Sequence, residues 1–522
     1  MTELFHGTWW DQHKTKQPDE VINGRFIQLF PDLPAARFDE ADLRQLAGVM
    51  TAKQERRPTP ETERDPEEDS EITAAYTYLG QFVDHDLTFD LTSHLREFLN
   101  PAEIRALADF RTPRLDLDNL YGRGPGDQPY MYKRHGIRML LGERMSGNPY
   151  DPCSRQIPRG PNDRALIGDP RNDENRIVAQ LHAIFLRFHN RVAQHLGETA
   201  SFDEVRQQVR WHYQWMLVTD FLPTVINNET YASVFPNPYK PAEPRLRELR
   251  HGLQHDHALL MPVEFSAAAF RFGHSMVRPL YRLNTTVERR PIFSRDSHDG
   301  VPADDAADLG GFRRIPSDWA IDWQFFIDLE HGAKPAETGP LFDRIVRKPQ
   351  KAYKIDTSLV SPLRHLPHRI AANPSILALR NLQRGAMFGL PSGQDVARAL
   401  GETPIPDKKL VIGKATADDQ KQPLIDIDTG FAGKAPLWAY ILSEAQVTSW
   451  DRAHPGVAKN DIPIKLGPVG GRIVAEVFAA LLRGDPTSYI CRKTQFRPIP
   501  EFSHDGKFGL AELINVALGR TP

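Results

Sequence analysis

The side chains in this sequence that could do chemistry begin with a short stretch, GQFVDHD, at residues 80–86. A helix would place Gln81, Asp84 and His85 on one face, because three and four residues separate them, and it would turn Asp86 elsewhere. A histidine titrates near neutral pH and can take and return a proton, so this face could do acid–base chemistry. A hydrogen-bonded structural histidine fits the same spacing, and both interpretations stay open at this point.

Two further segments carry a charged or metal-binding side chain. In GDPRNDEN (168–175), Arg171 and Glu174 are three residues apart and could share a helix face, either as functional groups or as an ordinary surface ion pair. In FRFGHSMVRPL (270–280), His274 lies in an apolar, amphipathic pattern that predicts a helix. It follows Gly273, which would let a bulky group approach the main chain. A buried structural histidine is the alternative there.

The composition narrows the function classes. Lys and Arg number 65 and Asp and Glu number 68 among 522 residues, so the net charge is −3 and no basic surplus indicates a nucleic-acid partner. Cys153 and Cys491 are too few for a disulfide scaffold or a four-thiolate metal site, and we expect two buried free thiols. No apolar run reaches the roughly 18 residues of a transmembrane helix. Residues 1–17 lack an apolar signal region, so the expected compartment is the cytoplasm, with signal-less secretion as the alternative.

The hydrophobic periodicity predicts a mainly α chain with little β-structure. The clearest helix spans residues 175–196, and the segment with GQFVDHD predicts another at 72–90. Further helices are expected at residues 203–219, 262–278, 374–383, 393–400, 436–449 and 470–483. Residues 1–73 are expected to form an N-terminal extension, in which the charged, proline-rich stretch 55–71 is a solvated loop.

Together the three segments resemble the signature regions of the animal-type haem peroxidases, within the peroxidase–cyclooxygenase superfamily. Four more segments support the likeness in the same order along the chain: LDLDNLYG (115–122), LHAIFLRFHNRVA (181–193), NLQRGAMFGLP (381–391) and LGPVGGRIVAE (466–476). The resemblance implies the multi-helix haem peroxidase fold, with residues 74–522 as the catalytic domain. It also implies haem b as a cofactor and hydrogen peroxide as a substrate.

The resemblance assigns roles to four of the side chains above. His85 matches the distal histidine, the acid–base group that moves a proton between the two oxygens of peroxide. Gln81 matches the distal glutamine, which orients water or a halide. Arg171 matches the distal arginine, a fixed cation that stabilises negative charge as the O–O bond polarises. His274 matches the proximal histidine, the fifth ligand of the haem iron.

Other matches concern how the haem would be held. Arg271 would pair with a haem propionate, and an ordinary surface arginine fits the sequence equally well. The second ring nitrogen of His274 would donate to an acceptor. Mammalian members of the family use an asparagine just after the GLP segment for this, and the aligned residue here is Gln394. Asp84 and Glu174 occupy the positions of the two carboxylates that form ester links to the haem in mammalian members.

A calcium ion is the second cofactor that the resemblance implies. Asp86 matches one ligand, and one loop would supply the others: Thr112, the main-chain carbonyl of Arg114, Asp116 and Asp118. Carboxylates, a hydroxyl and a carbonyl are hard oxygen ligands that suit calcium. The family more often has a serine where Asp118 stands, so this site would be more acidic. A solvated acidic loop is the alternative.

The expected function is that of a haem peroxidase, which oxidises halides, pseudohalides or phenolic one-electron donors through a ferryl intermediate. One alternative is a haem-dependent fatty-acid dioxygenase. The cyclooxygenase branch has a radical-forming tyrosine where this chain has Ile321, which favours the peroxidase. Another alternative is a non-catalytic, calcium-stabilised adhesion module on the same scaffold, which need not keep His85, Arg171 and His274. The reducing substrate and the oligomeric state are left open.

Overall fold

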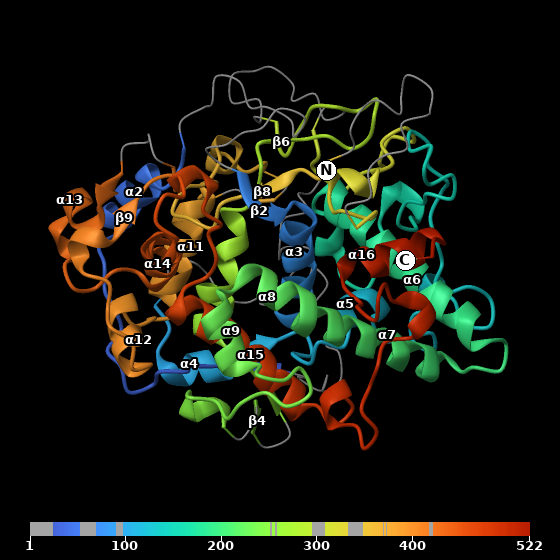
Figure 1. Cartoon of the computed structure of the whole chain (residues 1–522), viewed down its shortest axis with the longest axis horizontal. Helices are drawn as coiled ribbons and strands as arrows, with labels where there is room; N and C mark the ends of the chain where they lie inside the picture. Colours follow the sequence, from blue (N-terminus) through green and yellow to red (C-terminus); the bar gives the residue numbers. More distant parts are fainter. Residues whose placement is uncertain are drawn as a thin grey trace.

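Helices make up most of the regular structure (Figure 1). The computed structural model describes residues 24–52, 69–89, 98–250, 253–255, 258–294, 308–331, 348–368, 370–371, 373–416 and 421–521. Its α-helices are α2 (Glu40–Val49), α3 (Ala75–Leu87), α4 (Pro101–Ala106), α5 (Asp118–Tyr121), α6 (Arg176–Leu196), α7 (Phe202–Met216), α8 (Leu222–Val225), α9 (Asn228–Val234), α10 (Val263–Ala267), α11 (Leu377–Met387), α12 (Gly393–Ala399), α13 (Leu424–Ile427), α14 (Leu437–Arg452), α15 (Pro468–Gly484) and α16 (Leu510–Leu518). The strands are β1 (Gly24–Ile27), β2 (Asp69–Thr73), β3 (Ala108–Asp109), β4 (Gln254–His255), β5 (Ala258–Pro262), β6 (Leu280–Tyr281), β7 (Arg290–Pro291), β8 (Lys351–Tyr353), β9 (Val411–Ile412) and β10 (Gln422–Pro423). The prediction of a mainly α fold with little β-structure is confirmed.

Helix α6 lies in the interior and packs against α3, α7 and α16. Its N-terminus is capped by Asn175, whose Oδ1 accepts hydrogen bonds from the main-chain N–H groups of Ile177 and Val178 at 3.1 and 2.8 Å. Every side chain from 176 to 189 is buried. A helix buried on all sides is held by its neighbours, so α6 is a rigid support for α3.

The described parts of the first 73 residues are packed into the same body as the rest of the chain. Strand β1 pairs in parallel with β5 and antiparallel with β3, and β2 pairs antiparallel with β8. One hydrophobic core contains side chains from Phe26 to Ala517. The proposed boundary after residue 73 stays a prediction, and most of the charged stretch 55–71, residues 55–68, lies outside the described residues.

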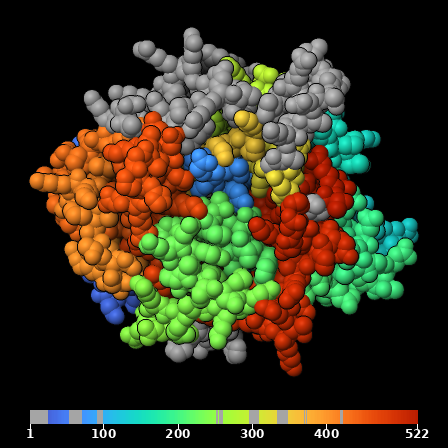
Figure 2. Space-filling view, viewed as in Figure 1, coloured from blue at the N-terminus to red at the C-terminus, as the bar shows by residue number. Residues whose placement is uncertain are grey.

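Segments far apart in the sequence lie side by side in the fold. Helix α9 contacts α15, and the surface view shows the green part of the chain against the red C-terminal part (Figure 2). The side chain of Glu476 on α15 accepts hydrogen bonds from the main-chain N–H groups of Arg245 and Leu246 at 3.1 and 3.0 Å.

The predicted helix at 262–278 is the main error in the sequence-based assignment. Helix α10 ends at Ala267, and Ala268 leaves the helical region at φ −135° and ψ −69°. A 3₁₀ helix then runs from Ala269 to His274. Residues 263–269 are all buried, so the apolar pattern had no polar face that could separate one long helix from two short ones. The break places His274 at the end of a 3₁₀ turn.

The two cysteines lie at the surface of the fold. Cys153 and Cys491 are free thiols as expected, but both are exposed, so the prediction of burial is wrong. Pro152 beside Cys153 is exposed too, and local sequence gave no sign that these surface segments leave the core. None of the described helices is both long enough and apolar enough to span a membrane.

Candidate functional site

A cavity of about 700 Å³ gathers most of the predicted site residues. Its lining comes from α3, the 3₁₀ helices 170–173 and 269–274, and α11, with a further wall near residues 363–374. The predicted residues that line it are Gln81, Asp84, His85, Arg171, Glu174, Arg271 and His274. Asp86 and Gln394 are not among the lining residues.

His85 is held by an amide on one side of its ring. Its Nδ1 lies 2.8 Å from Oδ1 of Asn172, and its Nε2 lies 3.9 Å from Oε1 of Glu174, too far for a hydrogen bond. Burial lowers the pKa of His85, and Arg171 lowers it further. The imidazole is therefore neutral near pH 7. With Nδ1–H bonded to the amide, Nε2 carries the lone pair that can accept a proton.

Arg171 is fixed by a buried carboxylate. Its Nε and Nη2 donate to both oxygens of Asp169, with Nη2 to Oδ2 at 2.7 Å, and Nη2 also donates to the main-chain carbonyl of His85 at 3.1 Å. Its guanidinium lies 4.3 Å from the ring centre of Phe89. Burial would raise the pKa of Asp169, but Arg111 and Arg171 outweigh it and lower that pKa well below its usual value. The cation therefore stays paired with a carboxylate and in a set position beside His85.

Gln81 and Glu174, from two different segments of the chain, meet inside the cavity. The Gln81 amide donates to Oε1 of Glu174, and Oε1 of Gln81 accepts from Nδ2 of Asn175 at 2.9 Å. Asp84 lies one turn after Gln81 on α3 and accepts from the hydroxyl of Thr88 at 3.4 Å. Both carboxylates that matched ester-forming positions thus line the cavity from different elements.

The partner of His274 differs from the expected one. Nδ1 of His274 lies 2.8 Å from Nδ2 of Asn381 on α11, and Nη1 of Arg271 donates to Oδ1 of the same amide at 3.0 Å. The Asn381 amide therefore lies between Arg271, which holds its oxygen, and the ring of His274. If His274 binds iron through Nε2, its Nδ1 carries hydrogen, and the Asn381 amide would turn its oxygen toward the ring. The expectation that Gln394 is the partner is wrong. Gln394 is committed elsewhere, donating to Asp407 at 3.0 Å and accepting from the N–H of Ala435 at 2.8 Å.

The cavity carries more positive charge at its α11 wall than the sequence indicated. Arg380 and Arg384 line it together with Arg271. Burial lowers the pKa of Arg380, and the nearby Arg271 lowers it further. Arg271 itself also donates to the main-chain carbonyl of Ser266 at 2.8 Å. Three guanidinium groups along one wall would favour an anionic group in the cavity.

The predicted calcium ligands form a separate acidic cluster. Carboxylate oxygens of Asp86, Asp116 and Asp118 lie within 4.8 Å of one another. Thr112 donates its hydroxyl to both oxygens of Asp116 at 2.8 and 2.9 Å. Arg114 belongs to the same loop, where its N–H donates to the carbonyl of Thr112 at 2.7 Å. The structure therefore brings together the residues that the resemblance named.

The acidic cluster is short of positive charge. Burial raises the pKa of Asp86 well above its usual value, and Asp118 and Asp116 raise it further. Arg111 lies 3.6 Å from Asp118 but is shared with Asp169 at 2.6 Å, and burial raises the pKa of Asp116 by more than Arg210 and Arg114 lower it. Oδ1 of Asp86 and Oδ1 of Asp118 have no hydrogen-bond partner among the described residues. Unpartnered carboxylate oxygens in a buried cluster fit a hard divalent cation.

A family model described as "Animal haem peroxidase" matches residues 100–407 of the chain. The chain belongs to the animal haem peroxidase family. The match includes Arg171, Glu174 and His274, whereas His85 and the rest of α3 precede it.

Relatives of this peroxidase-family chain include much longer proteins. Peroxidasin homolog pxn-2 of Caenorhabditis elegans is 24% identical over 417 residues, which cover 74% of this chain and 27% of the relative. Thyroid peroxidase of Homo sapiens is 26% identical over 354 residues, which cover 61% of this chain and 34% of the relative. The chain thus spans about a quarter to a third of the length of these relatives.

Solved structures agree with the family on the fold. Peroxidase A from Dictyostelium discoideum superposes with a TM-score of 0.53 at 16% identity, covering 92% of this chain and 96% of that one. A fatty acid alpha-dioxygenase from Arabidopsis thaliana superposes with a TM-score of 0.51 at 14% identity, covering 93% and 75%. At such identities the likeness establishes the haem peroxidase fold alone.

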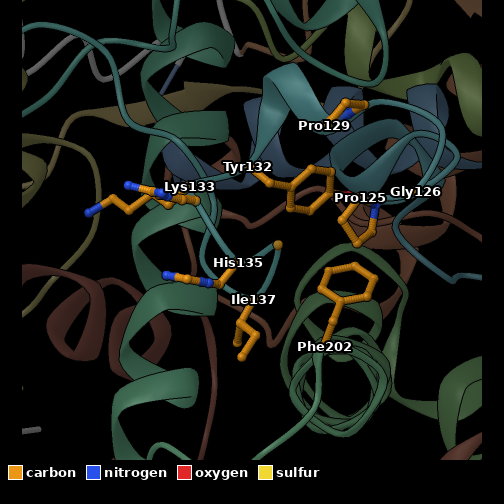
Figure 3. A pocket seen from close by; sticks show the side chains of 10 residues that line it. Pro125, Gly126, Pro129, Tyr132, Lys133, His135, Ile137 and Phe202 are labelled. Atoms are coloured by element: carbon orange, nitrogen blue, oxygen red, sulfur yellow. The ribbon is translucent and has the colours of Figure 1, made fainter.

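A second hollow, of about 500 Å³, is lined by Phe202 and by residues between 125 and 137 (Figure 3). Its lining includes Tyr132 and Phe202, which are drawn as sticks with Pro125, and the exposed Lys133 and His135. No predicted site residue lines it. His85 and His274 line the larger cavity, whereas His135 lines this smaller hollow.

Several residues of the larger site were not identified from the sequence. They are Asn172, His182, Asn381, Arg380 and Arg384. Asn172 lies in GDPRNDEN, His182 in LHAIFLRFHNRVA and Asn381 in NLQRGAMFGLP, so all three belong to segments that carried the family resemblance. The signal was present in those segments, but contacts between different elements decide which polar side chain meets which.

Proposed function

We propose that this chain is a haem peroxidase that uses hydrogen peroxide to oxidise halides, pseudohalides or phenolic donors. The observation that supports it best is the convergence of His85, Arg171 and His274 on one cavity. These side chains come from α3, the 3₁₀ helix 170–173 and the 3₁₀ helix 269–274. A fold kept only as an adhesion scaffold would have no need of that arrangement.

The cavity fits a haem by three independent features. A Cβ built on Gly273 would meet nothing within 4 Å, so the main chain beside His274 faces open space in the cavity. Apolar side chains such as Phe272 and Phe388 form much of the wall. The arginines at the α11 wall, Arg380 and Arg384 with Arg271, would pair with the haem propionates. His274 would hold the iron through Nε2.

A bound haem would supply the electrons that reduce peroxide, and the distal side chains would transfer the protons of the peroxide. Nε2 of His85 would accept a proton from one peroxide oxygen and return it to the other, so that water leaves. The lowered pKa of His85 keeps the ring neutral and ready for the first of these steps. Arg171 would stabilise the negative charge that develops as the O–O bond breaks, from a position that Asp169 fixes in advance. Gln81 would orient water or a halide beside Glu174.

The proposal includes two features that hold the site together. Calcium bound by Asp86, Asp116 and Asp118 would fix the C-terminal end of α3, where His85 lies. Ester links through Asp84 and Glu174 would fix the haem and replace two half-buried carboxylate charges with neutral bonds. The reducing substrate would then reach a haem that cannot shift in the cavity.

An absorption spectrum of the purified, haem-loaded protein, recorded before and after peroxide, tests the proposal. We expect a Soret band that shifts on peroxide addition and returns when iodide or a phenol is added. His274→Ala should lose most of the haem, because no other imidazole among the described residues lines the cavity except His85. His135→Ala, in the smaller hollow, should keep it. A chain that binds no haem would support the adhesion module, and oxygen uptake driven by a fatty acid would support the dioxygenase.

A further inference from the structure

Behind the distal histidine lies a second, fully buried histidine that the reaction does not touch. His182 on α6 has no exposed surface, and its Nδ1 lies 3.0 Å from Nδ2 of Asn172. The same amide accepts from His85 through Oδ1 at 2.8 Å. One asparagine, itself completely buried, therefore joins two imidazoles, with one end of its amide on each.

An amide placed in this way couples the protonation of the two rings. Its oxygen can only accept and its NH₂ can only donate, so the ring that faces the oxygen must carry hydrogen on Nδ1 and the other ring must not. In the structure His85 faces the oxygen and His182 faces the NH₂ group. His85 is then the Nδ1–H tautomer and His182 the Nε2–H tautomer. Turning the amide over would reverse both tautomers together.

We propose that Asn172 and His182 are positioning residues, which set the tautomer of His85 so that Nε2 presents its lone pair to the cavity. This rests on the proposed peroxidase function, because only a distal base needs that tautomer. His182 acts through Asn172, which touches His85 directly. Neither residue meets peroxide or haem, since neither lines the cavity.

The surroundings of His182 support a fixed, neutral ring. Phe82 on α3 meets it edge-on at 6.0 Å, and Phe82 stacks on Phe185 of α6 at 4.3 Å. Burial lowers the pKa of His182 to about 3, so the ring stays uncharged at neutral pH. Its Nε2 has no hydrogen-bond partner among the described residues. A buried polar atom without a partner is costly and calls for a reason. Control of the His85 tautomer is such a reason.

The consequence for the reaction is large, because only one tautomer can begin it. With hydrogen on Nδ1, the free Nε2 can accept the first proton from peroxide. With hydrogen on Nε2, the cavity would face a donor, and the first proton transfer would have no acceptor. In serine proteases, a catalytic histidine in the wrong tautomer lowers kcat by about 10⁴.

Histidine ¹⁵N NMR of the full-length chain tests the coupling without measuring turnover. The protein is labelled with ¹⁵N-histidine, loaded with haem and held as the diamagnetic ferrous carbonyl complex. Two buried histidines calibrate the spectrum. His212 donates from Nδ1 to the carbonyl of Gln208 at 2.7 Å while its Nε2 accepts from Ile499. His189 donates from Nε2 to the carbonyl of Ile137 at 2.7 Å. We expect His85 to match the His212 pattern and His182 the His189 pattern.

Two variants then interrupt the hydrogen-bonded chain His85–Asn172–His182 at different points. Asn172→Ala should leave both rings as mixtures of tautomers, and His182→Phe, which keeps an aromatic ring against Phe82, should leave His85 as a mixture. Peroxide turnover should fall about 10- to 100-fold in both, the usual effect of losing an outer hydrogen-bond partner at a metal-site histidine. If Asn172→Ala fails to fold, His182→Phe carries the test alone. Hydrogen on Nε2 of His85 in the wild type, or an unchanged His85 tautomer in the variants, would overturn the coupling. Expected tautomers in a chain without peroxidase activity would instead overturn the proposed function.

Discussion

His85 and Asp86 are consecutive residues of α3, yet their side chains belong to two different sites. His85 lines the cavity, and Asp86 points into the acidic cluster with Asp116 and Asp118. Tyr213 on α7 donates to Oδ2 of Asp86 at 3.2 Å, which leaves Oδ1 unpartnered among the described residues. A cation that stabilises the acidic cluster would therefore also fix the part of the α3 backbone that carries His85.

Removal of calcium should destabilise the protein and slow its reaction. Without a cation the carboxylates of buried Asp86 and half-buried Asp116 and Asp118 repel one another. Calcium at one hundred times its Kd should raise the free energy of unfolding by about 2.7 kcal/mol. Calorimetry with calcium and after chelation measures the change. Asp118→Asn should reduce the calcium dependence, and Asp127→Asn, an exposed change outside the cluster, should keep it. An unfolding temperature that ignores calcium would contradict the assignment of this cluster as a cation site.

Loss of the distal base should leave the haem in place but slow its use. We expect His85→Ala to retain haem, since His274 would hold the iron in the proposed site, and to lower the rate of peroxide reduction by about 10² to 10⁴, the usual contribution of a placed acid–base group. Stopped-flow absorption of the Soret band after mixing with peroxide measures this rate. His135→Ala is the matched control, because this exposed histidine lies in the smaller hollow (Figure 3). Equal rates for His85→Ala and the wild type would remove His85 from the mechanism.

The distal site could be predicted from the sequence because it depends on local geometry. Gln81, Asp84 and His85 meet on one face of α3 through helical spacing alone, and α3 begins and ends within three residues of the predicted limits. The position of Arg171 likewise depends on one short element, the 3₁₀ helix 170–173. Side chains of this kind reach their places as soon as the local helix or turn forms.

The proximal site was harder to predict because it depends on how elements dock. Asn381 meets His274 because α11 packs against α10 and the adjoining 3₁₀ helix, and nothing in the spacing of either segment fixes that contact. An alignment anchored on the GLP segment pointed to Gln394, which lies on α12 and bonds Asp407. The break at Ala268 was hidden for a related reason, since full burial erases the polar face that marks a helix.

The pH dependence of stability should reveal the neutral, buried state of His182. Its pKa falls from 6.5 to about 3 in the fold because of burial. Between these values the unfolded chain binds a proton that the folded chain does not, so the free energy of unfolding decreases as the pH falls below 6.5. His182→Phe lacks this effect. Its destabilisation relative to the wild type should therefore be about 2 kcal/mol smaller at pH 5 than at pH 7.5.

Urea unfolding of both proteins at the two pH values measures the difference. His135→Phe provides the control, because it makes the same substitution at an exposed position outside the site. A destabilisation by His182→Phe that is the same at pH 5 and pH 7.5 would show that folding does not lower the pKa of His182.

Covalent attachment of the haem should involve both carboxylates of the cavity, one ester each, and should require prior turnover with peroxide. Asp84 lies beside His85 on α3, and Glu174 lies one turn after Arg171, so they reach the cavity from different elements. Glu174 must first leave the Gln81 amide that now donates to it. Peroxide-treated protein should keep its haem through acid–acetone extraction, because each ester is a covalent bond between the haem and the chain. Untreated protein should release it.

The two links should be separable by conservative substitution. Asp84→Asn should abolish one ester and Glu174→Gln the other, each leaving a partly extractable haem, and the double variant should release all of it. Mass spectrometry of a protease digest would identify haem-bearing peptides that contain Asp84 or Glu174. Glu264→Gln supplies a control, since this carboxylate is fully buried outside the cavity and accepts from the N–H groups of Leu29 and Phe30. Complete extraction of haem after repeated peroxide cycles would rule out the esters and leave the peroxidase assignment intact, because His274 alone holds the iron in that proposal.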